Sequence, residues 1–421
     1  MVTAPPDLDG LLEHLDECVT PHHTVERVAR TLLSAGFVEM HDVSADPVSR
    51  GFLRRDGLII AWTQPENGVK SFRLLGAHTD SPCLKVKPRP DSGTLGWRQI
   101  GVEIYGGILN NSWLDRDLGI AGRIVLADGT SRLFRSSSPV ARIPQLAVHL
   151  DREVNERGLV LDRQAHLLPV SGTGSGRGFV DWLADEIAIE SGDVASWDLS
   201  LFDTARATVI GFDSDLLVSG RIDNQVSCWA SIGALLDSQS AATSVVALFD
   251  HEEVGSESVT GASGPWLERV LRMLAVRLDD PSDPTSFDRL LSRSECLSAD
   301  CAHAVHPNYA ERHDPAHRPL PNVGPVLKVN ANQRYATSDL TAARFGAACR
   351  AAGVEQQIFS SKNSVPCGST IGPLAATRLG IPTADVGAPQ LSMHSAREMC
   401  GIRDPHLLRR ALSAFLALPA R

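Results

Sequence analysis

Several features that would mark other protein classes are missing from this sequence. It has no CxxC pair, no run of lysine and arginine, and no apolar run near the ~18–20 residues that a membrane span needs. Eight scattered cysteines favour reduced thiols of a cytosolic protein over a disulfide framework. The start lacks a charged-then-apolar signal, and a formal charge of −10 argues against nucleic acid. We expect a soluble, cytoplasmic protein that binds neither nucleic acid nor a membrane.

The length and the pattern of the chain predict two domains. At 421 residues the chain exceeds the size at which a single core keeps growing. Apolar strands alternate with helical patterns near both ends, which predicts an α/β, three-layer domain with a mixed, largely parallel sheet. Short β-rich segments interrupt this pattern. We therefore assign residues 1–88 and 218–421 to the α/β domain and residues 89–217 to a β-rich insert.

A glycine-rich segment, Ser171–Gly178, lies inside the predicted insert. Such segments can bind phosphate when they connect an apolar strand to a helix. No apolar strand of four or more residues enters this one directly, and no Walker lysine follows it. We interpret it as a flexible loop.

A group of acidic residues follows the predicted buried strand at residues 245–249. Asp250, Glu252 and Glu253 place three carboxylates within four residues, with no lysine or arginine nearby. Buried carboxylates repel one another and are costly without a partner, so a divalent cation is an economical solution. The second histidine of the helical HExxH pattern is missing. The remaining ligands of such a cation must come from distant parts of the chain.

Other candidates are ambiguous when taken one at a time. His78 and Asp80 follow an apolar strand, so that one could bind a metal while the other orients it, but a loop histidine beside a turn aspartate fits equally well. Asp223 precedes a predicted helix and could be a simple N-cap or a bridging ligand. His394 at a strand end could be structural.

Asp300 offers a further oxygen ligand close to two histidines. Cys301, His303 and His306 could alternatively form a structural zinc site, although a fourth ligand at the usual spacing is missing. With Asp300 as a ligand, these histidines would instead surround a substrate.

Together these segments resemble one family. The similar stretches are GAHTDSP (76–82), GRIDN (220–224), DHEEVGS (250–256), SADCAHAVHPNY (298–309), LKVNANQRYATS (327–338) and MHSAREM (393–399). In content and order they resemble the signature stretches of the M18 metallopeptidases, the aspartyl aminopeptidase family.

The resemblance implies a site for two divalent ions, usually zinc, in each subunit. Asp223 would bridge the ions, His78 and Asp300 would complete one site, and Glu253 and His394 would complete the other. Asp80 would orient His78, and Glu252 would act as the general base that deprotonates a water and protonates the leaving amine.

The resemblance also implies a substrate and an assembly. Lys328 and Tyr335 would bind an acidic N-terminal residue of a peptide, with His303 nearby. The insert would be a dimerisation domain of a homo-oligomer, a dodecamer in this family, in which His149 reaches a neighbouring active site. The family commonly has a histidine where this chain has Gln145, which departs from the pattern.

Two other functions compete with a two-zinc aminopeptidase. One is a catalytically silent scaffold of the same fold, and the other is a carboxypeptidase or deacylase of the related two-metal fold. Because every expected ligand and the base are present, the sequence favours an enzyme. The large insert and the MHSAREM segment favour the aminopeptidase branch.

Overall fold

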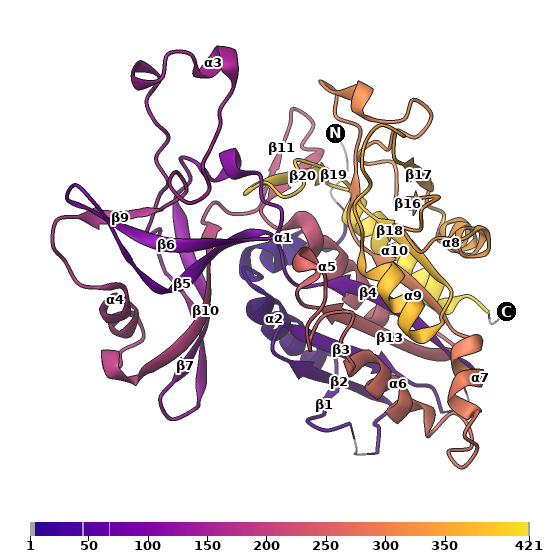
Figure 1. Ribbon diagram of the computed structural model, residues 1–421. Helices are drawn as coiled ribbons and strands as arrows, with labels where there is room; N and C mark the ends of the chain where they lie inside the picture. The colour runs from indigo at the N-terminus through magenta and orange to yellow at the C-terminus, as the bar shows by residue number, and fades with distance from the viewer. Residues whose placement is uncertain (1–4, 44–45, 67, 420–421) are drawn as a thin grey trace.

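A nine-stranded sheet forms the centre of the protein. The computed structural model describes residues 5–43, 46–66 and 68–419 (Figure 1). In spatial order the strands are β1 (Val38–Glu39), β2 (Arg50–Arg55), β3 (Leu58–Thr63), β13 (Ala242–Phe249), β4 (Val69–His78), β14 (Glu295–Ala299), β18 (Thr383–Gly387), β16 (Val326–Val329) and β17 (Gln357–Ser360). Five of the eight neighbouring pairs are parallel, including all those among β13, β4, β14 and β18. The predicted mixed, largely parallel sheet is confirmed.

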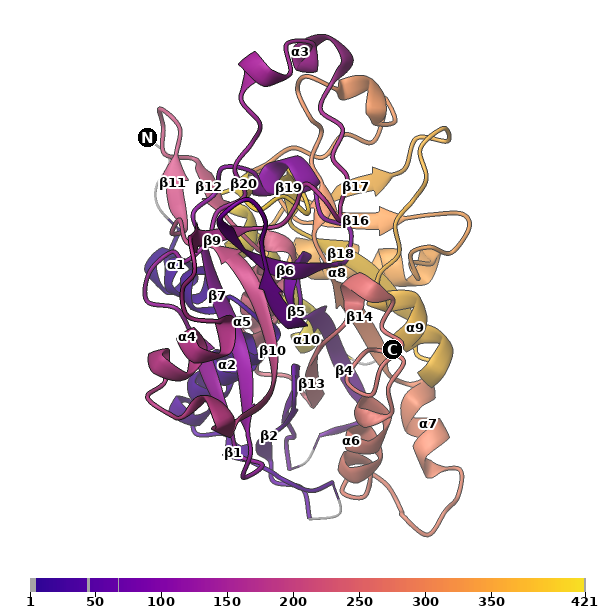
Figure 2. The same cartoon turned by 60° about the vertical axis from the view of Figure 1, so that its left-hand side comes forward.

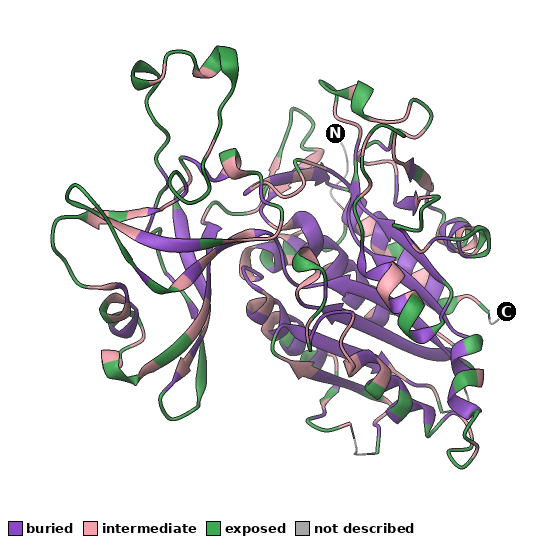
Figure 3. Ribbon diagram, in the orientation of Figure 1, coloured by how far each residue is buried: buried purple, intermediate pink, exposed green. Residues whose placement is uncertain are grey.

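Helices cover both faces of this sheet because successive strand residues point to opposite sides. In β4, Leu75 and Ala77 pack on one face and Phe72 and Leu74 on the other. The first face is covered by α1 (Leu8–Glu17), α2 (Pro21–Ser34), α5 (Ile222–Asp237), α8 (Asp339–Ala352) and α10 (Asp404–Ala417). The second is covered by α6 (Trp266–Ala275), α7 (Ser286–Ser292) and α9 (Ile371–Leu379). The resulting three-layer α/β architecture, with its buried sheet, is visible in Figure 3.

A six-stranded antiparallel sheet stands beside this body in both views (Figures 1 and 2). Its strands, in spatial order, are β8 (Ser131–Arg135), β7 (Leu118–Leu126), β10 (Val194–Asp203), β5 (Cys83–Ser92), β6 (Trp97–Tyr105) and β9 (Val170–Thr173). It has a hydrophobic cluster of its own, to which α4 (Phe179–Glu186) contributes Phe179 and Leu183. Its strands all lie between β4 and β11 in the chain, and β5 begins at Cys83, ahead of residue 89, where the sequence predicts the insert to start.

The glycine-rich segment corrects one prediction. Its first three residues, Ser171–Thr173, belong to β9 and are not part of a loop. Their backbone runs antiparallel to the start of β6, with Arg98 opposite Gly172. Edge pairing with β6 therefore outweighs the low strand propensity of glycine there. Only residues 174–178 connect β9 to α4 as a loop.

A small third sheet connects the exit of the insert to the C-terminal part of the body. It consists of β11 (Thr208–Ile210), β12 (Leu216–Ser219), β20 (Glu398–Gly401), β19 (Pro389–Leu391) and β15 (Ala302–His303). All eight cysteines are free thiols, in agreement with the sequence. Within the described ranges, no helix has the length and apolar character required to cross a bilayer.

Candidate metal centre

The central parallel strands bring the predicted site residues to one edge of the large sheet. His78 is the last residue of β4, Asp300 follows β14 directly, and Glu253 lies in the short helix η4 (Glu252–Val254) just after β13. Because these strands are parallel, their carboxyl ends meet at the same edge, where α/β proteins commonly bind ligands. Asp223 comes from the first turn of α5. His394 lies in the connection between β19 and β20.

Two groups of metal-binding side chains share one aspartate. In the first, His78 Nε2 lies 3.4 Å from Asp223 Oδ1 and 3.6 Å from Asp300 Oδ1. In the second, His394 Nε2 lies 3.4 Å from Glu253 Oε2 and 3.8 Å from Asp223 Oδ2. Within each group the potential ligand atoms all lie within 4.8 Å of one another. The two carboxylate oxygens of Asp223 therefore face two separate groups.

Hydrogen bonds on the far side of each imidazole orient the two histidines. His78 Nδ1 lies 3.0 Å from the backbone carbonyl of Asp80, and His394 Nδ1 lies 3.1 Å from the carbonyl of Gly107. A carbonyl only accepts, so the Nδ1 atom carries the hydrogen in each ring. In a neutral ring, Nε2 then presents a lone pair to carboxylate oxygens.

Acceptors that face acceptors need a proton or a cation between them. Among the described residues no hydrogen bond reaches the buried atoms Asp223 Oδ1 and Glu253 Oε1. Imidazole nitrogens and carboxylate oxygens at such spacing are the ligands that zinc prefers. The residues present therefore fit a pair of divalent cations.

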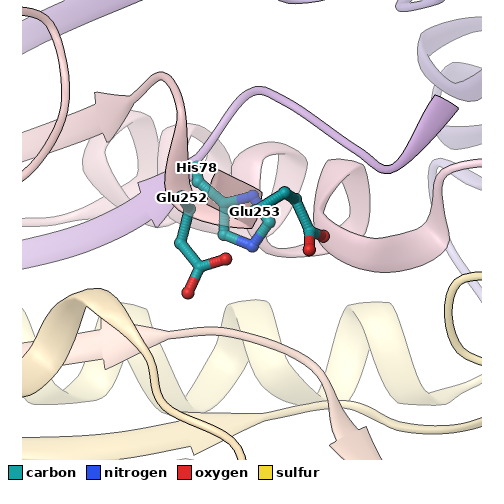
Figure 4. Close-up of side chains that lie close together, drawn as sticks. All are labelled: His78, Glu252 and Glu253. Atoms are coloured by element: carbon teal, nitrogen blue, oxygen red, sulfur yellow. The ribbon is translucent and has the colours of Figure 1, made fainter. Parts of the chain in front are cut away.

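A third group, which overlaps the other two, contains Glu252. It comprises His78, Glu252 and Glu253, and Figure 4 shows the two glutamates on opposite sides of the His78 ring. The peptide N–H groups of Glu252 and Glu253 donate to Asp80 Oδ1 and Oδ2 at 3.1 and 3.0 Å. Asp80 thus holds both the His78 side of the site, through its carbonyl, and the η4 side, through its carboxylate.

The carboxylates of the site differ in how their protons are held. Burial raises the pKa of Glu252 to about 8, and the charges of Asp300 and Asp80 act in the same direction. Burial and the charge of Asp223 likewise raise the pKa of Glu253 well above its usual value. For Asp80, burial is outweighed by hydrogen bonds from His78 and Tyr105, so its pKa is lowered. Asp80 is therefore ionised. Glu252 and Glu253 become ionised only when positive charge lies nearby.

Three of the four predicted substrate residues, Lys328, Tyr335 and His303, line a cleft of about 580 Å³ next to these groups. Lys328 is buried, and its Nζ lies 3.1 Å from Asp300 Oδ2 and 3.2 Å from the carbonyl of Cys301. The same ammonium lies 5.1 Å from the centre of the Tyr335 ring. His303 is exposed to the cleft, and desolvation by the surrounding protein together with the charge of Lys328 lowers its pKa, so this ring is neutral near pH 7.

Sequence reasoning missed two residues of the site. Glu398 accepts the peptide N–H of His394 at 2.6 Å and that of Asp223 at 2.9 Å, and so connects both groups. It lies in the MHSAREM stretch, which was the available signal. Arg334 also lines the cleft, is exposed, and forms no ion pair with any residue that the structure describes. It directly precedes Tyr335.

Two other sequence interpretations lie outside this site. Within the part of the chain that the structure describes, no potential metal group combines Cys301, His303 and His306, and Cys301 Sγ instead faces the carbonyl of Ile222 at 3.6 Å. His149 lies in the short helix η2 (Val148–Leu150), is exposed, and does not line the cleft of its own chain. Its segment and α3 (Val154–Arg157) form a protruding loop, the arm (residues 144–166), visible in Figures 1 and 2.

Comparison with known proteins identifies the class. A profile of the family described as "Aminopeptidase I zinc metalloprotease (M18)" matches residues 14–416. A Streptomyces coelicolor protein named probable M18 family aminopeptidase 2 is 48% identical over 421 residues, 97% of each chain. The class is therefore that of zinc metalloaminopeptidases. This chain belongs to the M18 family.

Solved structures agree with this assignment. The M18 aminopeptidase of Thermotoga maritima superposes with a TM-score of 0.86 at 25% identity, covering 99% of this chain and 98% of that one. The S. cerevisiae structure described as an mApe1 dodecamer gives a TM-score of 0.83 at 28% identity, covering 97% of this chain and 96% of that one. The carboxypeptidase or deacylase alternative is thereby replaced by an aminopeptidase.

Proposed function

We propose that this zinc metalloaminopeptidase uses two ions per subunit to remove acidic residues, Asp or Glu, from the N-termini of peptides. The observation that carries the proposal is the shared aspartate: each Asp223 oxygen faces a different imidazole Nε2. A carboxylate placed in this way suits a bridge between two cations. His78 and Asp300 would hold one ion with Asp223, and Glu253 and His394 would hold the other.

The ions, when bound, would polarise the scissile carbonyl and lower the pKa of the attacking water. Glu252 supplies the proton transfer. Its half-buried carboxylate lies beside His78, where nearby cations would offset the charges that raise its pKa. As an ionised base it takes a proton from water, and as an acid it then gives that proton to the leaving amine. Asp80 fixes the peptide N–H of Glu252 and thereby its direction.

Positive charge in the cleft supports a preference for acidic side chains. Lys328 uses two of its three donors on Asp300 and Cys301, which leaves one for a substrate carboxylate. Arg334 adds a second cation, and Tyr335 and the neutral His303 complete this part of the cleft. A neutral imidazole can accept as well as donate a hydrogen bond, which suits it to contact a peptide group.

We further propose a cytoplasmic homo-oligomer, a dodecamer like the S. cerevisiae structure. The arm exposes apolar side chains, with Leu150 at 75% and Val160 at 83% exposed. Exposed apolar groups gathered on one protruding segment are typical of an interface. In such an assembly His149 would reach the cleft of a neighbouring copy. Eight free thiols suit a reducing compartment.

One experiment tests the core of the proposal. Metal content is measured by elemental analysis, and the same preparation is assayed against a panel of peptides that differ only in the N-terminal residue. The proposal expects two zinc ions per chain and faster cleavage of Asp and Glu than of Ala and Leu. One zinc per chain, or equal rates across the panel, would contradict the corresponding part.

A further inference from the structure

Tyr105 connects the inserted sheet to the catalytic loop. It is the last residue of β6, where its backbone pairs with Cys83, and its hydroxyl donates to Asp80 Oδ2 at 2.7 Å. The chain has three tyrosines: Tyr335 lines the cleft and Tyr309 is exposed. Tyr105 is not among the described residues that line the cleft.

The Asp80 carboxylate depends on few donors. Its side chain is buried, and Oδ2 receives the Tyr105 hydroxyl together with the peptide N–H of Glu253. Oδ1 receives the N–H of Glu252 and lies 3.4 Å from Nδ1 of His78. Without the phenol, Oδ2 would keep one of its two donors. A buried carboxylate that loses a donor is destabilised or rotates to find another partner. Rotation would move the peptide groups of Glu252 and Glu253 with it.

Contacts on the insert side hold the Tyr105 ring in place. Lys85 Nζ lies 4.8 Å from the ring centre and is itself held by Asp198 Oδ1 at 2.7 Å. Asp198 also lies 3.2 Å from Nε2 of His22, at the start of α2 in the body. A cation over an aromatic face is attracted by its quadrupole. The ring is therefore fixed from both parts of the molecule, which makes its hydroxyl a well-placed donor.

We propose that Tyr105 is a positioning residue for the peptidase reaction, acting through Asp80 on Glu252 and Glu253. This inference rests on the proposed roles of those three residues. It assigns the insert a part in catalysis within the same subunit, distinct from any part in assembly.

The test uses Tyr105→Phe in the full-length protein, because phenylalanine keeps the ring and removes only the hydroxyl. Loss of a group that orients metal-site residues typically costs about 10–100-fold in activity or metal affinity. We expect kcat to fall by about that factor with KM changed less than about twofold, since the substrate is not touched. Zinc affinity, measured by competition with a chromophoric chelator, should weaken in parallel.

Two further variants make the result decisive. Replacing Tyr105 with p-aminophenylalanine restores a donor at the same place and should recover most of the lost kcat. Tyr309→Phe removes an exposed hydroxyl elsewhere and should match wild type. The inference is overturned if Tyr105→Phe keeps wild-type kcat and zinc affinity, or if the amino analogue stays at the level of phenylalanine. A fully active Glu252→Gln would instead overturn the proposed base, and the zinc comparison would still decide the role of Tyr105.

Discussion

The two large sheets contribute different kinds of groups to one site. Strands of the nine-stranded sheet lead into most of the charged and ligating side chains, at the carboxyl ends of β4, β13 and β14. The six-stranded sheet and the segment after it supply neutral groups: the Tyr105 hydroxyl and the Gly107 carbonyl. Neutral partners can orient a histidine or a carboxylate without adding charge to a crowded acidic centre. The comparison distinguishes residues that would bind metal or transfer protons from residues that orient them.

Removing the metal should have the largest effect on activity and stability. The loss of stability should be larger in the α/β body than in the insert. Chelation is expected to abolish activity, and zinc at about 100 times its Kd should restore about 2.7 kcal/mol of stability per site. Hydrogen exchange with and without zinc checks this, with the largest change expected after β4 and β13. Equal changes in hydrogen exchange in β7 and β8 of the insert would contradict the view that the ligating residues belong mainly to the body.

Glu252→Gln comes next, because it removes the proposed base while keeping size and hydrogen bonding. We expect kcat to fall by about 10³–10⁴-fold, near the upper end for general acid–base catalysis. Zinc content should be unchanged. The matched control is Glu257→Gln, which alters an exposed glutamate five residues further along the chain. Unchanged turnover in the Glu252 variant would refute its role.

Lys328→Met tests which cation selects the substrate. Loss of a hydrogen bond between charged partners costs about 1.5–3 kcal/mol, so the ratio of kcat/KM for Asp over Ala substrates should fall about 10–150-fold. Arg334→Met serves as the comparison variant. Because Lys328 also contacts Asp300, zinc content must be measured in both. If only Arg334→Met lowers the ratio of kcat/KM for Asp over Ala substrates, Arg334 and not Lys328 selects the acidic residue.

Substitutions on the arm should alter assembly more than chemistry. Leu150→Asp places a charge on the exposed apolar segment, and light scattering should show a smaller particle than wild type. Leu33→Asp, on α2 of the body and 50% exposed, is the control and should keep the wild-type mass. An arm variant of unchanged mass would place the interface elsewhere.

The smallest effect concerns pH and a buried histidine of the body. Burial lowers the pKa of His14 to about 4, with the charge of Arg27 acting in the same direction. Between pH 6.5 and about 4 the unfolded chain therefore binds this proton and the folded chain does not, so stability falls as pH falls, by at most about 1.4 kcal/mol per unit. When the free energy of unfolding is measured with urea at several pH values, it should change less steeply with pH in His14→Gln than in wild type. The exposed His166→Gln of the insert should keep the wild-type slope, and identical slopes in all three would contradict this origin.

The sequence predicts the body well where apolar runs end in ligating residues. The alternation of strands and helices and the break near Pro21 follow local patterns that the structure shows. The gathering of His78, Asp223 and Glu253 was expected only from the family resemblance, because no local pattern joins residues so far apart in the chain. The strand β14 does not stand out in the sequence, because it contains Glu295, whose charge is paired with Arg344 at 2.8 Å. Only the tertiary fold supplies that partner.

The orienting groups could not be found in the same way. Tyr105 lies 25 residues from Asp80, and Glu398 lies 175 residues from Asp223. Nothing local distinguishes a tyrosine that ends a strand. Glu398 lies in the MHSAREM stretch, but nothing in that stretch shows which peptide groups its carboxylate accepts from. Their roles come from hydrogen bonds across the fold. The pairing of Lys328 with Asp300 was missed for the same reason.

The loop that carries His394 is clasped by the backbone beyond β6. The carbonyl of Gly107 accepts from its ring nitrogen, and the N–H of Leu109 donates to its carbonyl at 3.0 Å. A truncated variant of this enzyme must therefore retain residues 105–112 together with the α/β core. A shortened chain without them would keep the acidic half of the site while leaving an imidazole free to swing. Natural variation in length should accordingly gather in the arm and spare this clasp.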